Sequence, residues 1–171
     1  MKTTFNNFYF FLSKKMEKYG VSLMRIALAI IYIWFGVLKI LGMSPAGDLV
    51  EKTVFWIRPE FFIPILGIFE VFIGIGLLIR KLIPKTIMLL LLHMTATLFP
   101  FFILKSSCFE VFPYEPTLVG QYIIKNLVLV AGALVIAGKY NEDYYVEMNL
   151  KKEQEKFAAN TQTHNHQILN E

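Results

Sequence analysis

The sequence predicts an all-α integral membrane protein: an antiparallel four-helix transmembrane bundle with a short N-terminal interfacial helix and a polar C-terminal tail. Four apolar runs predict the spans, at about 21–42, 61–79, 83–104 and 118–138. At ~1.5 Å per residue, each run is about long enough to cross ~30 Å of hydrocarbon. Of the 171 residues, 56% are hydrophobic, and they cluster in these runs where a soluble domain would spread them.

Residues 1–20 are expected to form an amphipathic segment that lies on the membrane surface. Phe5, Phe8, Leu12 and Met16 fall about on one helical face. Three lysines follow this apolar stretch, which is the wrong order for a cleaved signal peptide. Lysines beside an apolar face favour an interfacial helix that places its charges at anionic headgroups.

The positive charges predict the topology of residues 21–140, the four-span bundle. Eleven lysines and arginines lie before the first span, between the second and third, or after the fourth, whereas three lie in the other two connections. By the positive-inside rule, both termini and the 80–85 turn are then cytoplasmic. The eleven are Lys2, Lys14, Lys15, Lys18, Arg80, Lys81, Lys85, Lys139, Lys151, Lys152 and Lys156; the three are Lys52, Arg58 and Lys105.

The segments between and after the spans have their own signals. Residues 43–60 open with a Ser-Pro-Ala-Gly turn, after which Asp48 is placed to cap a short surface helix. The turn from Arg80 to Lys85 is very short, so the second and third spans should form a tight hairpin. The polar tail at 141–171 is expected to be cytoplasmic, with a helical start followed by disorder.

Ionisable side chains inside the spans are the candidate functional residues. Placing such a group in lipid costs free energy, so these side chains are expected to face the interior of the bundle, where they mark functional sites. Helical spacing gives each span one polar or small-residue stripe, which supports this convergence. These candidates are Arg25, Lys39, Glu70, His93 and Lys125.

Depth along the helices predicts which of these charges meet. Measured from the outer ends of the spans, Lys125 lies about 10 Å deep, Glu70 about 13 Å and His93 about 16 Å. We therefore predict an ion pair between Glu70 and Lys125, with Lys39 reaching them from above and His93 just below. Such a pair could also serve only to fix helix register. Arg25 is expected to snorkel to the inner face.

Several classes of function have no support in the sequence. It contains no Gly-rich phosphate loop, nucleophile elbow or HExxH motif, so we assign no catalytic residue and no metal site, and the chain is not expected to be an enzyme on its own. The single Cys108 excludes an internal disulfide. The net charge of +4 sits beside the spans, so it indicates topology and not nucleic-acid binding.

Residues 20–140 contain a set of short motifs that recur in a known family. The motifs are Met24-Arg25, Gly36-x-x-Lys39, Gly67-x-x-Glu70 with Gly74, Lys125-Asn126, and Ala131-Gly132-Ala133. Together they resemble the DoxX-like group of small four-span bacterial membrane proteins, and within it the YkgB-type inner-membrane proteins. The resemblance implies a four-helix bundle in the bacterial inner membrane, with a link to quinone-coupled oxidoreductases or to resistance against oxidants such as reactive chlorine. It implies no catalytic residue.

Three functions remain open at this stage. In the first, the protein is an accessory or redox-linked subunit, and a quinone headgroup sits between Glu70, His93 and Lys125 with lipid access for its tail. Its partners are then the lipid bilayer and a membrane oxidoreductase or further copies of itself. In the second it is a small proton-coupled transporter or exporter, against which stands the lack of an evident broken helix. In the third it is a non-catalytic membrane scaffold.

Overall fold

The computed structural model describes the backbone of residues 2–168 except 46 and 55–56, and the side chains of residues 6–157 with the same exceptions. The side chain of Phe5 therefore lies outside the described residues. The chain divides into two compact units, Met1–Ala137 and Gly138–Glu171. Within the described part of the chain, four helical segments are long and apolar enough to cross a membrane, which confirms the predicted all-α class.

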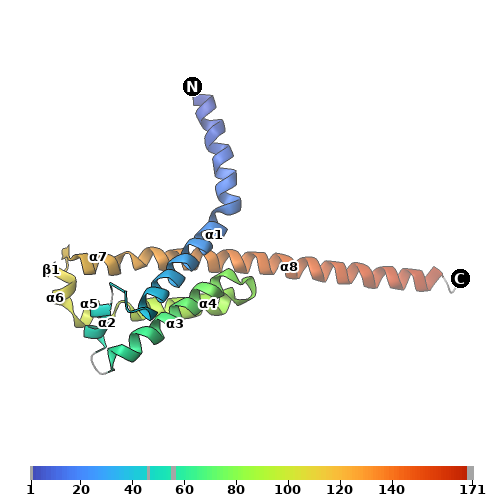
Figure 1. Cartoon of the computed structure of the whole chain (residues 1–171). Coiled ribbons are helices and arrows are strands. Elements are labelled where there is room, and N and C mark those ends of the chain that lie inside the picture. Colours follow the sequence, from blue (N-terminus) through green and yellow to red (C-terminus); the bar gives the residue numbers. More distant parts are fainter. Residues whose placement is uncertain (1, 46, 55–56, 169–171) are drawn as a thin grey trace. The chain divides into compact units, whose positions relative to one another are not determined.

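Figure 1 shows the succession of helices along the chain. The two strands form a small antiparallel pair beside the helices. In chain order the elements are α1 (Lys2–Ile40), α2 (Gly47–Thr53), α3 (Pro59–Leu78), the 3₁₀ turn η1 (Arg80–Leu82), α4 (Ile83–Ala96), α5 (Phe99–Ile103), α6 (Lys105–Cys108), β1 (Phe109–Val111), β2 (Glu115–Pro116), α7 (Leu118–Ile124) and α8 (Asn126–Ile168).

Local sequence explains where several of these helices begin. Pro59 and Pro84 lie in the first turns of α3 and α4, where a residue without a backbone N–H costs nothing and a fixed φ favours the helix. Thr117 caps α7 by accepting a hydrogen bond from the Gly120 N–H. A short helix forms near Asp48 as expected and is α2, but it begins at Gly47, so Asp48 lies in its first turn and not before it. The predicted tight hairpin is α3–η1–α4.

The helix expected at residues 1–20 forms as the N-terminal part of α1, which runs without interruption from Lys2 to Ile40. One expectation about the C-terminal tail is wrong at the level of the backbone. Helix α8 continues to Ile168, where we expected disorder in the tail. In the second unit Lys139 pairs with Glu142 and Asp143, and such i,i+3 and i,i+4 pairs favour a solvated helix.

The third and fourth predicted spans are each interrupted. The third consists of α4 and α5, separated at Thr97 and Leu98, and the fourth changes from α7 to α8 at Lys125. Pro100 explains part of the first break, because its missing N–H leaves the Ala96 carbonyl without its usual i+4 donor. At the second break the Val128 N–H bonds the Lys125 carbonyl, so the Ile124 carbonyl loses that donor. Neither break is predicted from the sequence, because the apolar run continues through both positions.

The interior of the first unit is small and the outside is apolar. Leu28, Ile73, Leu77, Leu90 and Ile123 are almost completely buried where the helices meet. Bulky apolar side chains instead cover the outward faces of the spans. An exposed apolar surface of this extent is the signature of a protein whose surroundings are lipid, so the chain is a multi-pass membrane protein in contact with the bilayer. Examples are Trp34, 64% exposed, Phe72, 66%, Met88, 72%, and Val128, 67%.

Candidate functional site

The centre of the first unit holds a buried ion pair between α1 and α3. Lys39 Nζ donates to both carboxylate oxygens of Glu70, at 2.6 Å to Oε2 and 2.9 Å to Oε1. Each residue is only 6% exposed. Charges so deeply buried persist only when they are paired and hydrogen-bonded. The pair therefore satisfies the charge of both groups within the bundle.

His93 on α4 extends this pair into a chain of hydrogen-bonding groups. Its Nε2 lies 3.2 Å from Glu70 Oε1, and its Nδ1 lies 3.4 Å from the Tyr32 hydroxyl. A neutral imidazole fits both contacts when Nε2–H donates to the carboxylate and Nδ1 accepts from the tyrosine O–H. The rings of Tyr32 and Phe69 flank the imidazole.

Two glycines on the same crossing explain why Lys39 and Glu70 meet. A Cβ on Gly36 would lie 2.5 Å from the Gly67 carbonyl oxygen, and a Cβ on Gly67 would lie 2.6 Å from the Gly36 oxygen. The backbones of α1 and α3 are therefore in direct contact, as small residues permit between membrane helices. Each charged residue follows its glycine by three positions, almost one helical turn, so both point along the same side of the crossing.

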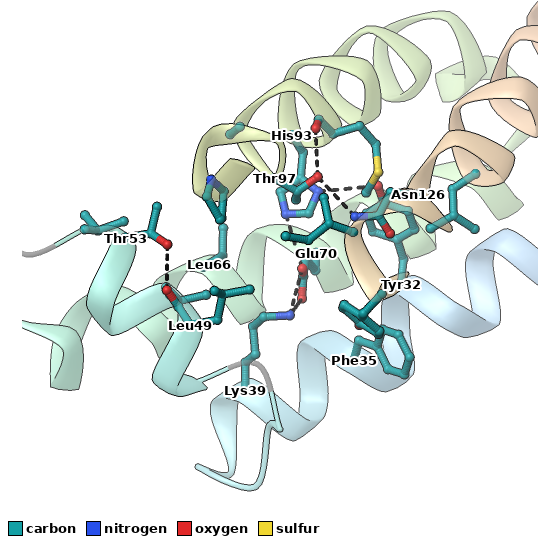
Figure 2. Close-up of a pocket in the computed structure, with 18 of the residues that line it drawn as sticks. Tyr32, Phe35, Lys39, Leu49, Thr53, Leu66, Glu70, His93, Thr97 and Asn126 are labelled. Carbon is teal, nitrogen blue, oxygen red and sulfur yellow. Dashed lines mark hydrogen bonds and ion pairs between the residues drawn. The ribbon is translucent and has the colours of Figure 1, made fainter. Parts of the chain in front are cut away.

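This polar chain forms part of the wall of a cavity of about 170 Å³. Figure 2 shows Lys39, Glu70 and His93 meeting at its centre, with Tyr32 and Phe35 on one side and Leu49 and Thr53 of α2 on another. The remaining lining is largely apolar, so the cavity has the usual composition of a small-molecule site, an apolar volume with a few convergent polar groups. The residues that complete it include Val50, Val54, Phe62, Leu66, Met94, Thr97, Pro100, Tyr122, Ile123 and Asn126.

Both helix breaks border the same cavity. The Asn126 amide nitrogen donates to Thr97 Oγ1 at 3.2 Å, which joins the start of α8 to the end of α4. Thr97 Oγ1 in turn donates to the Met94 carbonyl at 2.7 Å. Non-helical backbone at membrane depth is tolerated where it is buried in protein or lines a cavity. The interruptions are therefore part of the construction of the site.

The predicted Glu70–Lys125 ion pair is wrong, since the structure pairs Glu70 with Lys39 and His93. Lys125 is exposed and stands at the break between α7 and α8. Depth along a helix does not fix rotation about its axis: Gly120 and Ile123 are buried and Asn126 lines the cavity, whereas Lys125 lies on an exposed face. Asn126, the next residue, takes the inward position that Lys125 was expected to occupy.

Arg25 also lies apart from the cluster. It precedes Tyr32 by seven residues, about 10 Å along the helix, and it is not among the residues that line the cavity. It is half-buried, and its Nε has no hydrogen-bond partner within the described part of the chain. Of the five residues predicted for the site, the structure therefore brings together Lys39, Glu70 and His93 and leaves out Arg25 and Lys125.

Several lining residues were not predicted for the site. Tyr32 precedes Lys39 by two helical turns and so lies on the polar face of the first span, but a tyrosine there more often packs its ring and satisfies its hydroxyl, so it was not assigned to the site. Leu49, Val50 and Thr53 of α2 carry no such signal, because only the folding of the 43–60 connection against the spans brings them to the cavity.

Comparisons with protein-family models, with curated proteins and with solved structures find no match to this chain.

Proposed function

We propose that this protein binds the headgroup of a quinone-type ligand in its central cavity, as a redox-linked accessory subunit of a membrane electron-transfer or oxidant-resistance system. One observation carries the proposal: a buried Lys39–Glu70–His93–Tyr32 chain lies at the wall of a ring-sized apolar cavity. A bound quinone would accept electrons and protons, and the electrons would come from a partner oxidoreductase.

The size of the cavity supports a single ring as the ligand. A cavity of roughly 150 Å³ lined by apolar side chains holds benzene in another protein, and this one has about 170 Å³. A planar ring therefore fits. The aromatic side chains of Tyr32, Phe35 and Tyr122 add surfaces on which a ring can pack.

The hydrogen-bond donors at the cavity wall suit a ring that carries oxygen atoms. An ammonium group has three N–H donors, and Lys39 directs two hydrogen bonds to Glu70. The third N–H is available to a ligand oxygen, since the described residues offer it no other partner. His93 and Tyr32 provide a route along which a proton can move towards Glu70. Carbonyl or hydroxyl oxygens match these groups, and a quinone carries them on a ring.

The remaining parts of the proposal come from the sequence. The motifs at Gly36, Lys39, Gly67 and Glu70 resemble those of the DoxX-like group, and these four residues meet at the crossing of α1 and α3. The resemblance supports a bacterial inner-membrane protein, and the distribution of lysine and arginine supports placement of both termini in the cytoplasm.

The test is direct binding of quinone by the purified protein. The full chain is extracted in mild detergent, its bound lipids are analysed by mass spectrometry, and a short-chain benzoquinone is titrated in. We expect quinone to co-purify, and Lys39→Met to weaken binding by at least about tenfold through loss of a charge-assisted hydrogen bond. The matched control is Lys125→Met, which removes an exposed lysine. Absence of bound quinone and of titratable binding would overturn the proposal.

A proton-coupled transporter or exporter is the second candidate, and the two helix breaks favour it. Discontinuous helices at a polar site are typical of secondary transporters, and breaks at Thr97 and Lys125 flank the cavity here. Proteoliposomes containing the wild-type chain should then show substrate-driven proton flux that Glu70→Gln abolishes. Equal flux with and without this substitution would exclude Glu70 as the coupling residue.

A scaffold without chemistry gives a different result in the same variants. Lys39→Met combined with Glu70→Gln removes both charges together, so the double variant should assemble even where each single variant does not. Full activity of the double variant in cells would favour the scaffold over both other functions.

A further inference from the structure

A second hollow lies beside the central cavity and opens between the end of α1 and the start of α7. It has a volume of about 270 Å³. Its own lining is formed by Leu38, Leu118 and Val119, together with the loop after α1. We call this hollow the side groove. Apart from Lys39, Ser44 and the Tyr122 hydroxyl its walls are apolar, so most of its surface suits a hydrocarbon chain.

The side groove and the central cavity share part of their walls. Phe35, Lys39, Leu49 and Tyr122 line both volumes, so the two are neighbours separated only by these side chains. The rings of Phe35 and Tyr122 stand at this boundary with centroids 6.4 Å apart and planes inclined by 38°. These two rings therefore form part of the boundary between the two volumes.

The outer side of the groove faces the surroundings of the helix bundle. Leu118 is 84% exposed, and Phe35 and Tyr122 are 38% and 42% exposed. All three residues are apolar or aromatic and lie in helices that are long and apolar enough to span a membrane. The groove therefore opens sideways, where acyl chains surround the protein, near the ends of the first and fourth spans.

The central cavity is too small for a ligand that carries a tail. Its volume of about 170 Å³ is close to that of a cavity filled by one benzene ring. A longer ligand must continue beyond the cavity, and the side groove is the neighbouring apolar volume. Lys39 borders both volumes, so a headgroup held at its ammonium would leave the tail next to the groove.

We propose that the side groove holds the apolar tail of an amphiphilic ligand whose polar ring lies in the central cavity, and that the ligand enters from lipid past Phe35 and Tyr122. This inference rests on the proposed headgroup site and deepens it. It identifies the ligand as a membrane-dissolved amphiphile with an oxygen-bearing ring, which excludes small water-soluble ring compounds as the natural ligand class.

The test compares a tail-less methylated benzoquinone with the same headgroup carrying a ten-carbon tail, on full-length protein in lipid nanodiscs. We expect the tailed compound to bind more than about tenfold tighter, since each buried CH₂ adds to affinity. Val119→Trp fills the groove and should remove this advantage while leaving the tail-less compound unaffected. Val128→Trp places the same side chain on an exposed position outside both volumes and should change neither affinity.

A second measurement covers the case in which Val119→Trp fails to fold. A tailed analogue with a photoreactive group in the tail should label α7 and the end of α1 in the wild-type chain. Equal affinity for both compounds, or labelling confined to α3 and α4, would overturn the tail route while the headgroup site stands. Failure of both compounds to bind would overturn the headgroup site and the tail route together.

Discussion

Gly36 on α1 and Gly67 on α3 pack with their backbones in contact, so that a Cβ on either one would meet the carbonyl oxygen of the other at 2.5–2.6 Å. This crossing sets the distance between the helices that carry Lys39 and Glu70. Because the glycines come one turn before the charged residues, the closeness of the backbones is what allows a short, doubly hydrogen-bonded ion pair.

Gly36→Ala should therefore destabilise the protein by about 1–3 kcal/mol, since overpacking at a tight contact forces the backbones apart. Gly20→Ala is the matched control, because a Cβ at Gly20 meets nothing within 4 Å. Alanine there should stabilise the helix slightly. Unfolding in a detergent series with increasing sodium dodecyl sulfate measures both, and shifts of the same sign would contradict the role given to the crossing.

Removal of one partner from the ion pair should cost more than removal of both. Lys39→Met leaves Glu70 as a buried charge that has lost its cation, with an expected loss of about 3–5 kcal/mol. Adding Glu70→Gln should recover most of that loss. Lys125→Met should change stability by less than about 0.5 kcal/mol, because the side chain is exposed. The same detergent unfolding assay checks all three variants. Equal losses of stability for Lys39→Met and Lys125→Met would contradict the assignment of Lys39 as the partner of Glu70.

The hydrogen bond between Asn126 and Thr97 should couple the two broken helices measurably. A double-mutant cycle of Thr97→Val and Asn126→Leu is expected to give about 0.6 kcal/mol, the mean for such bonds between membrane helices. Thr95→Val serves as the control in place of Thr97→Val, because the Thr95 hydroxyl donates to the Leu91 carbonyl of its own helix. A coupling of zero in the Thr97 cycle would show that the bond does not hold the breaks together.

Cys108 should be unreactive in the folded protein. Burial raises the pKa of its thiol above the usual range, and the thiolate is the reactive form. Labelling by a maleimide should therefore be slow at neutral pH and should rise only at a higher pH than for an exposed thiol. The comparison is a Ser106→Cys/Cys108→Ala protein, since Ser106 is exposed nearby. Equal labelling rates across the pH range would show that the site is open.

Reporter fusions check the proposed topology. Fusions at both ends of the chain and at the turn formed by η1 should report the cytoplasm, and fusions in α2 or between β1 and β2 should report the opposite side. If the two chain ends were found on opposite sides of the membrane, the proposed orientation would be wrong and the chain would cross the membrane an odd number of times. The fold of the described residues would then require one of the four candidate helices to lie outside the membrane.

Much of the architecture follows from the sequence alone. Apolar runs of about 20 residues must be helices in lipid, because only a helix satisfies every backbone group within one segment. This requirement predicted the class, the four spans and the tight turn at Arg80–Lys85. The rule that charges face inward also identified Lys39, Glu70 and His93, which the structure places together.

Only the tertiary structure decided which cation Glu70 takes as its partner. Depth along ideal helices placed Lys125 nearest, but depth says nothing of rotation about the helix axis, and Lys125 lies on an exposed face of its helix while Asn126 beside it lines the cavity. The contact of Gly36 with Gly67 brings Lys39 in instead. The cavity itself could not be predicted from the sequence, because it arises where the four spans and the 43–60 connection meet, and no single segment determines the space left between them.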